Sequence, residues 1–149
     1  MLTWRLVGPQ HEPTALTGEG AAIFGGRWNP VGQPLVYTAD SLALATLELL
    51  VHQVGTRREL LALHLDLPDG EIEELEVTRL PRRWREREPV TAAIGREWAM
   101  SGRSLALVVP SAVIDPLSGE RDVLINPAHP AMPGVTVVQR LEVVLDERL

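Results

Sequence analysis

The chain has 149 residues, of which 45% are hydrophobic and 23% are charged, and its formal net charge is −6 at pH 7. These values are typical of one globular domain, residues 1–149, with a sizeable core, and the acidic balance argues against a general nucleic-acid-binding protein. The sequence contains no run of 18 apolar residues and no signal-peptide pattern at its N-terminus. We therefore expect a cytoplasmic protein that does not bind membranes.

Two residue types are absent, because the sequence has no cysteine and all 14 of its basic residues are arginines. The absence of cysteine excludes disulfides, thiol nucleophiles and cysteine-ligated zinc. The absence of lysine excludes a Walker phosphate-binding loop and a Schiff-base lysine. The four histidines show no metal-ligand spacing, and Gly18-Glu19-Gly20 is only a fragment of a dinucleotide-binding fingerprint. We expect no metal and no Rossmann site, so any phosphate must be held by arginine, hydroxyl groups or backbone amides.

The first third of the chain predicts two strands and one long helix. In chain order these are a strand at 2–7, a polar loop at 8–17, a short helical turn or loop at 18–24, a strand at 34–38 and a helix at 41–54. Asp40-Ser41 is the expected cap of that helix, and Gly55 its expected C-terminal residue. Leu, Ala and Val occur almost all round the helix, which predicts burial on most sides.

The remainder predicts mainly short strands. In chain order these are a strand at 60–67, a stretch of undetermined type at 71–77, an arginine-rich segment at 78–88, a helix at 90–100, strands at 104–109 and 123–125, an irregular stretch at 126–134 and a closing strand at 135–145. The arginine-rich segment could contact an acidic partner, but a charge run usually forms a solvated face. Because short strands outnumber helices without regular alternation, the fold class is α+β, a single domain with mixed or antiparallel sheets.

Three polar side chains between residues 25 and 52 indicate a cleft. Arg27 follows Gly25-Gly26, and a guanidinium held on such a turn is suited to phosphate or carboxylate. Tyr37, the only tyrosine, ends an apolar strand. The alternatives are a solvated arginine in an ordinary turn and a half-buried core tyrosine with a wet hydroxyl.

Glu48 is the sharper signal, because it is an acid inside an apolar helix. Burying an unpaired carboxylate there costs several kcal/mol, so pairing or a polar cleft is expected. The alternative places Glu48 on one wet stripe with Thr46, His52 and Gln53. Ser111 follows the strand at 104–109, where clefts commonly lie, although a serine there can also bond its own turn.

The stretch from Gly25 to His52, GGRWNPVGQPLVYTADSLALATLELLVH, resembles the core motif of the RES domain, the toxin half of a bacterial toxin–antitoxin family. The similarity runs from Trp4-Arg5 to Leu149. It continues at Trp84, residues 94–98 (IGREW), 109–113 (VPSAV) and 124–127 (LINP), His129-Pro130 and 146–149 (DERL). Several matches in register are more specific than any one of them.

The resemblance implies an ADP-ribosyltransferase-like fold in which two small sheets form a cleft. It maps the polar residues characteristic of the family to Arg27, Tyr37, Glu48 and Ser111, and implies cleavage of the nicotinamide–ribose bond of NAD. It also implies a partner antitoxin with an Xre-like helix-turn-helix domain. Homodimers are a further possibility, since closed dimers are the commonest assemblies.

Each candidate has an expected role in this chemistry. Bond cleavage develops an oxocarbenium ion on the ribose, which the Glu48 carboxylate would stabilise. Arg27 would hold the pyrophosphate, Tyr37 would offer its ring to nicotinamide and its hydroxyl to the ribose, and Ser111 would hydrogen-bond a phosphate, the ribose or the acceptor. The further candidate NAD contacts are Arg5, Trp28, Asn29 and Asn126.

The acceptor stays open among water, inorganic phosphate and a protein side chain. Two other functions also stay open at this point. One is a nucleotide- or protein-binding module without turnover. The other, an RNase-like toxin, has little support, because the chain is acidic and shows no pair of catalytic histidines.

Overall fold

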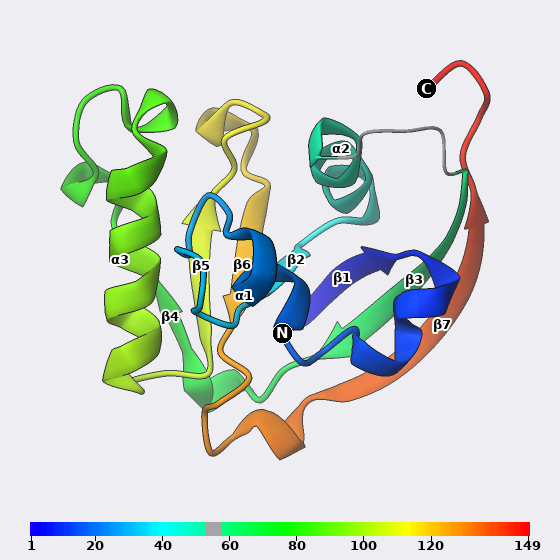
Figure 1. Ribbon diagram of the computed structural model, residues 1–149, viewed down its shortest axis with the longest axis horizontal. Helices are drawn as coiled ribbons and strands as arrows, with labels where there is room; N and C mark the ends of the chain where they lie inside the picture. Colours follow the sequence, from blue (N-terminus) through cyan, green and yellow to red (C-terminus); the bar gives the residue numbers. More distant parts are fainter. Residues whose placement is uncertain (53–57) are drawn as a thin grey trace.

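The computed structural model describes residues 1–52 and 58–149, and seven strands occur within them (Figure 1). The strands are β1 (Leu2–Val7), β2 (Val36–Ala39), β3 (Glu59–Asp66), β4 (Ile72–Glu74), β5 (Ala106–Pro110), β6 (Arg121–Ile125) and β7 (Thr136–Val144). They form one sheet in the order β4-β5-β6-β2-β1-β3-β7. β4 and β5 run parallel, whereas the other neighbouring pairs are antiparallel.

The sheet consists of two halves joined along a short edge. In the described part of the chain, β1 and β2 pair at one register position, Trp4 opposite Ala39, and the strands of the two halves run in different directions in Figure 1. Val108 and Ile125 of one half and Val7 and Leu63 of the other belong to the same buried cluster. The predicted single α+β domain with small mixed and antiparallel sheets is therefore confirmed, with the refinement that the sheets join edge to edge.

Three α-helices lie within the described residues: α1 (Glu19–Phe24), α2 (Leu42–His52) and α3 (Glu88–Ser101). α3 lies beside β4 and β5 in Figure 1, and its Trp98 packs with Trp28 and Leu107 in a second buried cluster. α2 places Leu44 in a third cluster with residues of β1, β2 and β3, among them Leu6. α3 and α2 thus each cover one half of the sheet, on the face opposite the cluster that the two halves share.

α3 packs unusually closely on the loop that follows α1. A Cβ atom built on Gly95 would lie 1.7 Å from the carbonyl oxygen of Trp28, far inside van der Waals contact. Only glycine allows this approach, and Trp28 itself is buried. The loop bearing Arg27 is therefore fixed against α3 through the backbone of the next residue.

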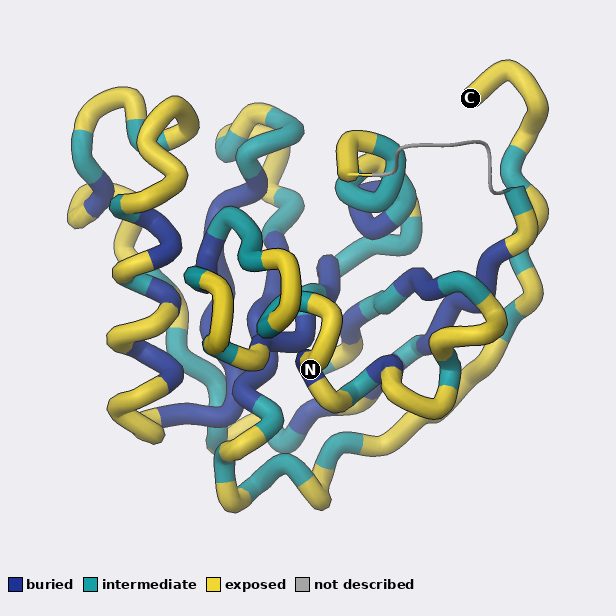
Figure 2. Tube along the Cα trace, viewed as in Figure 1, coloured by how far each residue is buried: buried dark blue, intermediate teal, exposed yellow. Residues whose placement is uncertain are grey.

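α2 begins as predicted, because the Ser41 hydroxyl accepts a hydrogen bond from Leu44 N at 3.0 Å. The end predicted at residues 53–55 lies outside the described residues. The prediction of burial on most sides is wrong: Leu44 and Ala45 are buried, whereas Leu47 and Val51 are 41% and 61% exposed. Figure 2 accordingly shows buried, intermediate and exposed stretches along α2. An all-round apolar pattern shows which side chains can be buried, but neighbours decide which are.

All six strands predicted from the sequence are present, each within two residues of the expected ends, and the undetermined stretch 71–77 contains β4. The stretches expected to be irregular contain short 3₁₀ helices instead. The 3₁₀ helices are Pro9–Thr14, Asp69–Glu71, Val77–Arg79, Trp84–Glu86, Pro116–Ser118 and Met132–Gly134. Such turns need only local i to i+3 hydrogen bonds, so no apolar periodicity reveals them. Among the described residues, no helix is long and apolar enough to cross a membrane.

Candidate active site

A cavity of about 720 Å³ lies at the junction of the two halves of the sheet. Its walls come from β1, β2, α1 and the loop after it, α2 and the start of β6. The polar side chains of its lining are those of Arg5, Arg27, Tyr37, Thr38, Glu48, His52 and Asp122. Four of the predicted site residues, from four different segments of the chain, therefore line one space: Arg5, Arg27, Tyr37 and Glu48.

Arg27 is held in place from outside the cavity. Its Nη1 donates to the carbonyl oxygen of Arg85 at 2.8 Å, and its Nη2 lies 4.0 Å from Glu88 Oε2. The Thr91 hydroxyl donates to the Arg27 carbonyl oxygen at 2.6 Å. The side chain is only 22% exposed, so the alternative of a solvated arginine in an ordinary turn is wrong.

The arginine-rich segment is accordingly partly structural. Arg79 and Arg83 form exposed ion pairs with Glu76 and Glu86, as a solvated face would. Arg85 differs, because its guanidinium donates to the Ile114 carbonyl oxygen while its own carbonyl accepts from Arg27. Nothing in the sequence pattern marks this carbonyl, since any residue supplies one.

Tyr37 closes the turn that carries Arg27. Its hydroxyl accepts a hydrogen bond from Trp28 N at 2.9 Å and donates to Asn29 Oδ1 at 2.6 Å. A Cβ atom on Gly26 would lie 2.8 Å from that hydroxyl, so glycine is required there. Burial raises the pKa of Tyr37 far above its usual range, which keeps the hydroxyl neutral. The hydroxyl is thus engaged in two hydrogen bonds with the loop, while the Tyr37 side chain also lines the cavity.

Three predicted NAD contacts do not line the cavity. Trp28 is buried in the core near Trp84. The Asn29 amide donates to the carbonyl oxygens of Ala21, Pro30 and Gln33. The Asn126 amide donates to the Ala99 carbonyl oxygen. These three predicted contacts are corrected: Trp28 fills the core, and the amides of Asn29 and Asn126 fix loops, because backbone carbonyls in irregular segments need donors.

Arg5 is a half-buried cation with no carboxylate partner among the described residues. Its Nε donates to the Ala15 carbonyl oxygen at 2.6 Å and its Nη1 to the Tyr37 carbonyl oxygen at 2.8 Å, and it forms no ion pair with any residue that the structure describes. Burial lowers the pKa of Arg5 to about 10, so it stays charged at neutral pH. An uncompensated half-buried charge at a cavity wall is suited to an anionic ligand.

Glu48 reaches the cavity from α2. Its side chain is 23% exposed, and its Oε2 lies 3.9 Å from His52 Nε2. Its Oε1 accepts a hydrogen bond of 2.6 Å from the hydroxyl of Ser111. Ser111 is fully buried and is not part of the cavity lining. Its hydroxyl also accepts from Val113 N and Ile114 N. Ser111 therefore bonds its own turn and also donates a hydrogen bond to Glu48 from outside the cavity.

Asp122 is a site residue that the sequence analysis missed. It is the second residue of β6, lies opposite Ala39, is 8% exposed and lines the cavity together with Glu48. Burial, together with the negative charges of Glu48 and Asp40, raises the pKa of Asp122 to about 9. An acid directly before an apolar run could have indicated this site residue, but the predicted strand began at Val123 and did not include Asp122.

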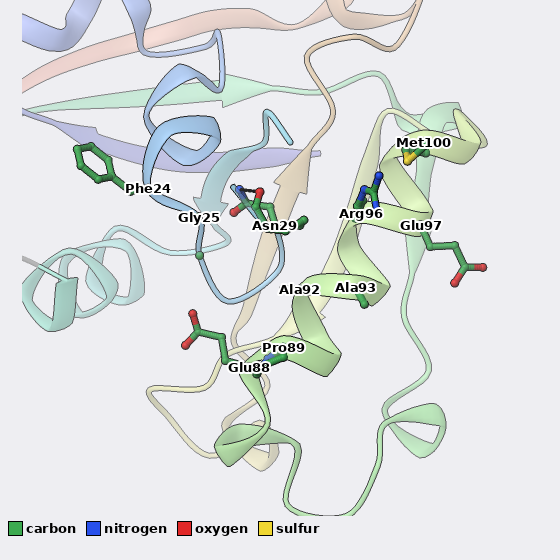
Figure 3. A pocket seen from close by; sticks show the side chains of 12 residues that line it. Phe24, Gly25, Asn29, Glu88, Pro89, Ala92, Ala93, Arg96, Glu97 and Met100 are labelled. Atoms are coloured by element: carbon green, nitrogen blue, oxygen red, sulfur yellow. Dashed lines mark hydrogen bonds between the residues drawn. The ribbon is translucent and has the colours of Figure 1, made fainter. Parts of the chain in front are cut away.

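A second hollow of about 790 Å³ lies between the loop after α1 and α3 (Figure 3). Ala92, Ala93 and Met100 give it an apolar floor, and the charged side chains of Glu88 and Glu97 extend from α3 around it. It shares Phe24, Gly25 and Gly26 with the first cavity. The predicted polar residues gather in the first cavity, which is therefore the candidate site.

The fold matches that of one chain in a solved toxin–antitoxin complex. The structure is similar to a chain of the Mycobacterium tuberculosis MbcT–MbcA toxin–antitoxin complex, with a TM-score of 0.67 over 96% of this chain and 84% of that chain, at 18% sequence identity. The chain belongs to the RES domain family, whose model matches residues 2–146.

Curated relatives agree with this membership. A protein named Toxin Res from Photorhabdus laumondii is 39% identical over all of this chain and 97% of its own length. A protein named Prs ADP-ribosylating toxin from a Sphingobium species is 39% identical over 89% of this chain and 86% of its own length. Another Toxin Res, from Yersinia enterocolitica, is 36% identical over 100% of this chain and 99% of its own length.

Proposed function

We propose that this RES domain is a toxin that cleaves the nicotinamide–ribose bond of NAD. The observation that supports this most directly is the cavity in which Arg5, Arg27, Tyr37 and Glu48 come together. Its volume of about 720 Å³ lies within the range of roughly 300–1,000 Å³ typical of small-molecule sites. Two guanidinium groups suit a pyrophosphate, and a carboxylate suits a ribose.

Cleavage of the nicotinamide–ribose bond is favoured by negative charge near the ribose. As the nicotinamide leaves as a neutral base, positive charge develops on the ribose, and a carboxylate held nearby stabilises it. Glu48 is the carboxylate available, and the Ser111 hydrogen bond restricts its orientation. No general acid is needed for this leaving group, so the role of Glu48 is electrostatic and orienting.

Arg27 and Arg5 would both bind the pyrophosphate, each from a different part of the cavity wall. Arg27 already donates to the Arg85 carbonyl oxygen and presents the rest of its guanidinium at the cavity wall. Arg5 carries a charge for which no described carboxylate compensates, so an anion bound nearby would stabilise it most. The Tyr37 ring offers an apolar face for the nicotinamide.

The test measures nicotinamide release from NAD by the wild type and by Glu48→Gln. The variant keeps the side-chain shape but removes the charge, so we expect kcat to fall by roughly 100-fold or more with folding intact. Glu142→Gln, on the exposed face of β7, is the matched control and should be unaffected. Equal activity of Glu48→Gln and wild type would refute the role of Glu48.

The acceptor is a separate question with a direct experiment. Incubation with NAD in the presence and absence of inorganic phosphate, followed by identification of the ribose product, distinguishes hydrolysis from phosphorolysis. A second candidate function is ADP-ribosyltransferase activity, which the name of the Sphingobium relative favours. Transfer of label from adenine-labelled NAD to a protein in a cell extract would identify it.

We further propose an antitoxin partner that carries an Xre-like helix-turn-helix domain. The similarity of this fold to a subunit of a toxin–antitoxin complex supports such a partner. Expression of the chain alone should arrest growth and lower cellular NAD, and co-expression of the antitoxin should restore both.

The alternative function, a binding module without turnover, has its own test. Calorimetry that shows NAD binding, together with no release of nicotinamide, would identify it.

A further inference from the structure

Asp122 and Glu48 are two acids that share one buried corner of the cavity. Asp122 comes from β6 and Glu48 from α2, both line the cavity, and Glu48 is close enough to Asp122 to raise the pKa of its carboxyl. A hydrogen bond between two carboxyl groups requires a proton on one of them. Such a bond between Asp122 and Glu48 would leave the pair with one proton and one negative charge.

The groups around the pair identify which acid holds that proton. Glu48 accepts from the Ser111 hydroxyl through Oε1, and His52 faces its Oε2 at 3.9 Å. The Ser111 hydroxyl thus already uses Glu48 as a hydrogen-bond acceptor. Asp122 is the more deeply buried acid, and nearby Asp40 adds a further negative charge.

No cation compensates Asp122 among the described residues. The Arg121 guanidinium points to the carbonyl oxygens of Pro116 and Glu120, and Arg5 on β1 donates to those of Ala15 and Tyr37. Arg27 is directed to Arg85 and Glu88. Burial and the charges of Glu48 and Asp40 accordingly raise the pKa of Asp122 to about 9.

We propose that Asp122 is a protonated positioning residue that donates a hydrogen bond to Glu48 and so fixes the carboxylate that faces the ribose. This inference rests on the proposed NAD cleavage for its activity readouts. Asp122 and Ser111 then hold Glu48 from two sides, and the corner carries one negative charge instead of two. Loss of the Asp122 proton would place two negative charges side by side and push Glu48 from its position.

The kinetic test compares Asp122→Asn with Asp122→Ala across pH. Asparagine keeps a donor for Glu48 without a titrating proton, so we expect kcat near wild type and no loss of activity above pH about 9. Alanine removes the donor, so kcat should fall by about 100-fold while KM for NAD changes little. Wild type should lose activity as pH rises through about 9. Full activity of Asp122→Ala, or an unchanged alkaline loss in Asp122→Asn, would overturn the proposal.

A spectroscopic test separates this inference from the proposed function. Carbon-13 NMR of labelled aspartate carboxyls should contain one protonated resonance at pH 7 that disappears in Asp122→Asn and stays in Glu142→Gln. If the protein cleaves no NAD but this resonance is present, the proposed function fails and the carboxyl pair stands. If every aspartate carboxyl is ionised at pH 7, the carboxyl pair fails whatever the activity.

Discussion

Arg5 is the residue whose environment is hardest to explain without a ligand. Its half-buried guanidinium donates to two backbone carbonyls but has no opposing charge among the described residues, and removing a charge from water without a partner is costly. Proteins retain such groups where binding requires them. Arg5 lines the cavity, so the pyrophosphate of a bound dinucleotide would supply the missing negative charge and offset this cost.

This interpretation predicts a selective effect of Arg5→Gln. A charge-assisted hydrogen bond contributes about 1.5–3 kcal/mol, so KM for NAD should rise roughly 10- to 100-fold with a smaller change in kcat. Nicotinamide riboside, which lacks the pyrophosphate, should be cleaved equally by variant and wild type. Arg140→Gln, which removes the surface ion pair to Glu12, serves as the control. An equal loss on both substrates would show that Arg5 acts on the fold and not on the phosphates.

At the scale of elements, the site depends on how α3 holds the loop bearing Arg27. Gly95 lets the helix touch the Trp28 carbonyl oxygen, and Thr91, one turn earlier on the same helix, donates to the Arg27 carbonyl oxygen. Arg85 and Glu88, just before and at the start of α3, contact the Arg27 guanidinium. One helix therefore fixes both the backbone and the side chain of this arginine.

Gly95→Ala tests that packing. Alanine gains up to about 1 kcal/mol of helix propensity over glycine, but relieving a clash at 1.7 Å requires backbone movement that costs roughly 3 kcal/mol or more. We expect net destabilisation in urea unfolding and a higher KM for NAD. Gly70→Ala, where an added Cβ meets nothing within 4 Å, should stay within about 0.5 kcal/mol of wild type. Unchanged stability of Gly95→Ala would mean that α3 is free to shift.

At the scale of the whole molecule, the buried acids make stability depend on pH. The pKa of Asp122 is raised from 3.8 to about 9 in the folded protein, so the folded state binds this proton more tightly than the unfolded state. Its favourable contribution to stability is complete below pH about 4 and is lost as pH rises to about 9. The pKa of Asp40 is also raised, chiefly by burial, and acts in the same direction.

Asp122→Asn should therefore be more stable than wild type at alkaline pH. Within the window between pH about 4 and about 9, the free energy of unfolding of wild type should fall relative to that of the variant by up to about 1.4 kcal/mol per pH unit. Urea unfolding of both proteins at pH 5, 7 and 8.5 measures this difference. A difference that does not change with pH would mean that Asp122 titrates normally when folded. With the raised pKa, in contrast, Asp122 would position Glu48 in the site while lowering the free energy of unfolding at alkaline pH.

Local patterns were sufficient for the elements and for part of the site. Period-two and continuous apolar runs located six of the seven strands, and Ser41 marked the start of α2, because these signals arise from contacts within a few residues. Glu48 attracted attention because an acid in an apolar helix needs a partner. The resemblance in residues 25–52 led to the family that the comparison confirms.

What only the tertiary structure decided is which groups meet. The sequence by itself determined the fold class and six of the strands that the structure describes, and it identified Arg27, Tyr37 and Glu48 as candidate site residues. The pairing of Trp4 with Ala39 brings β1, and with it Arg5, to the same cavity. The partners of Asp122, the carbonyl of Arg85 and the structural roles of Trp28, Asn29 and Asn126 were likewise settled by folding. Hydrogen bonding and charge act between neighbours in space, and residues such as 48 and 122 become neighbours only when the two halves of the sheet come together.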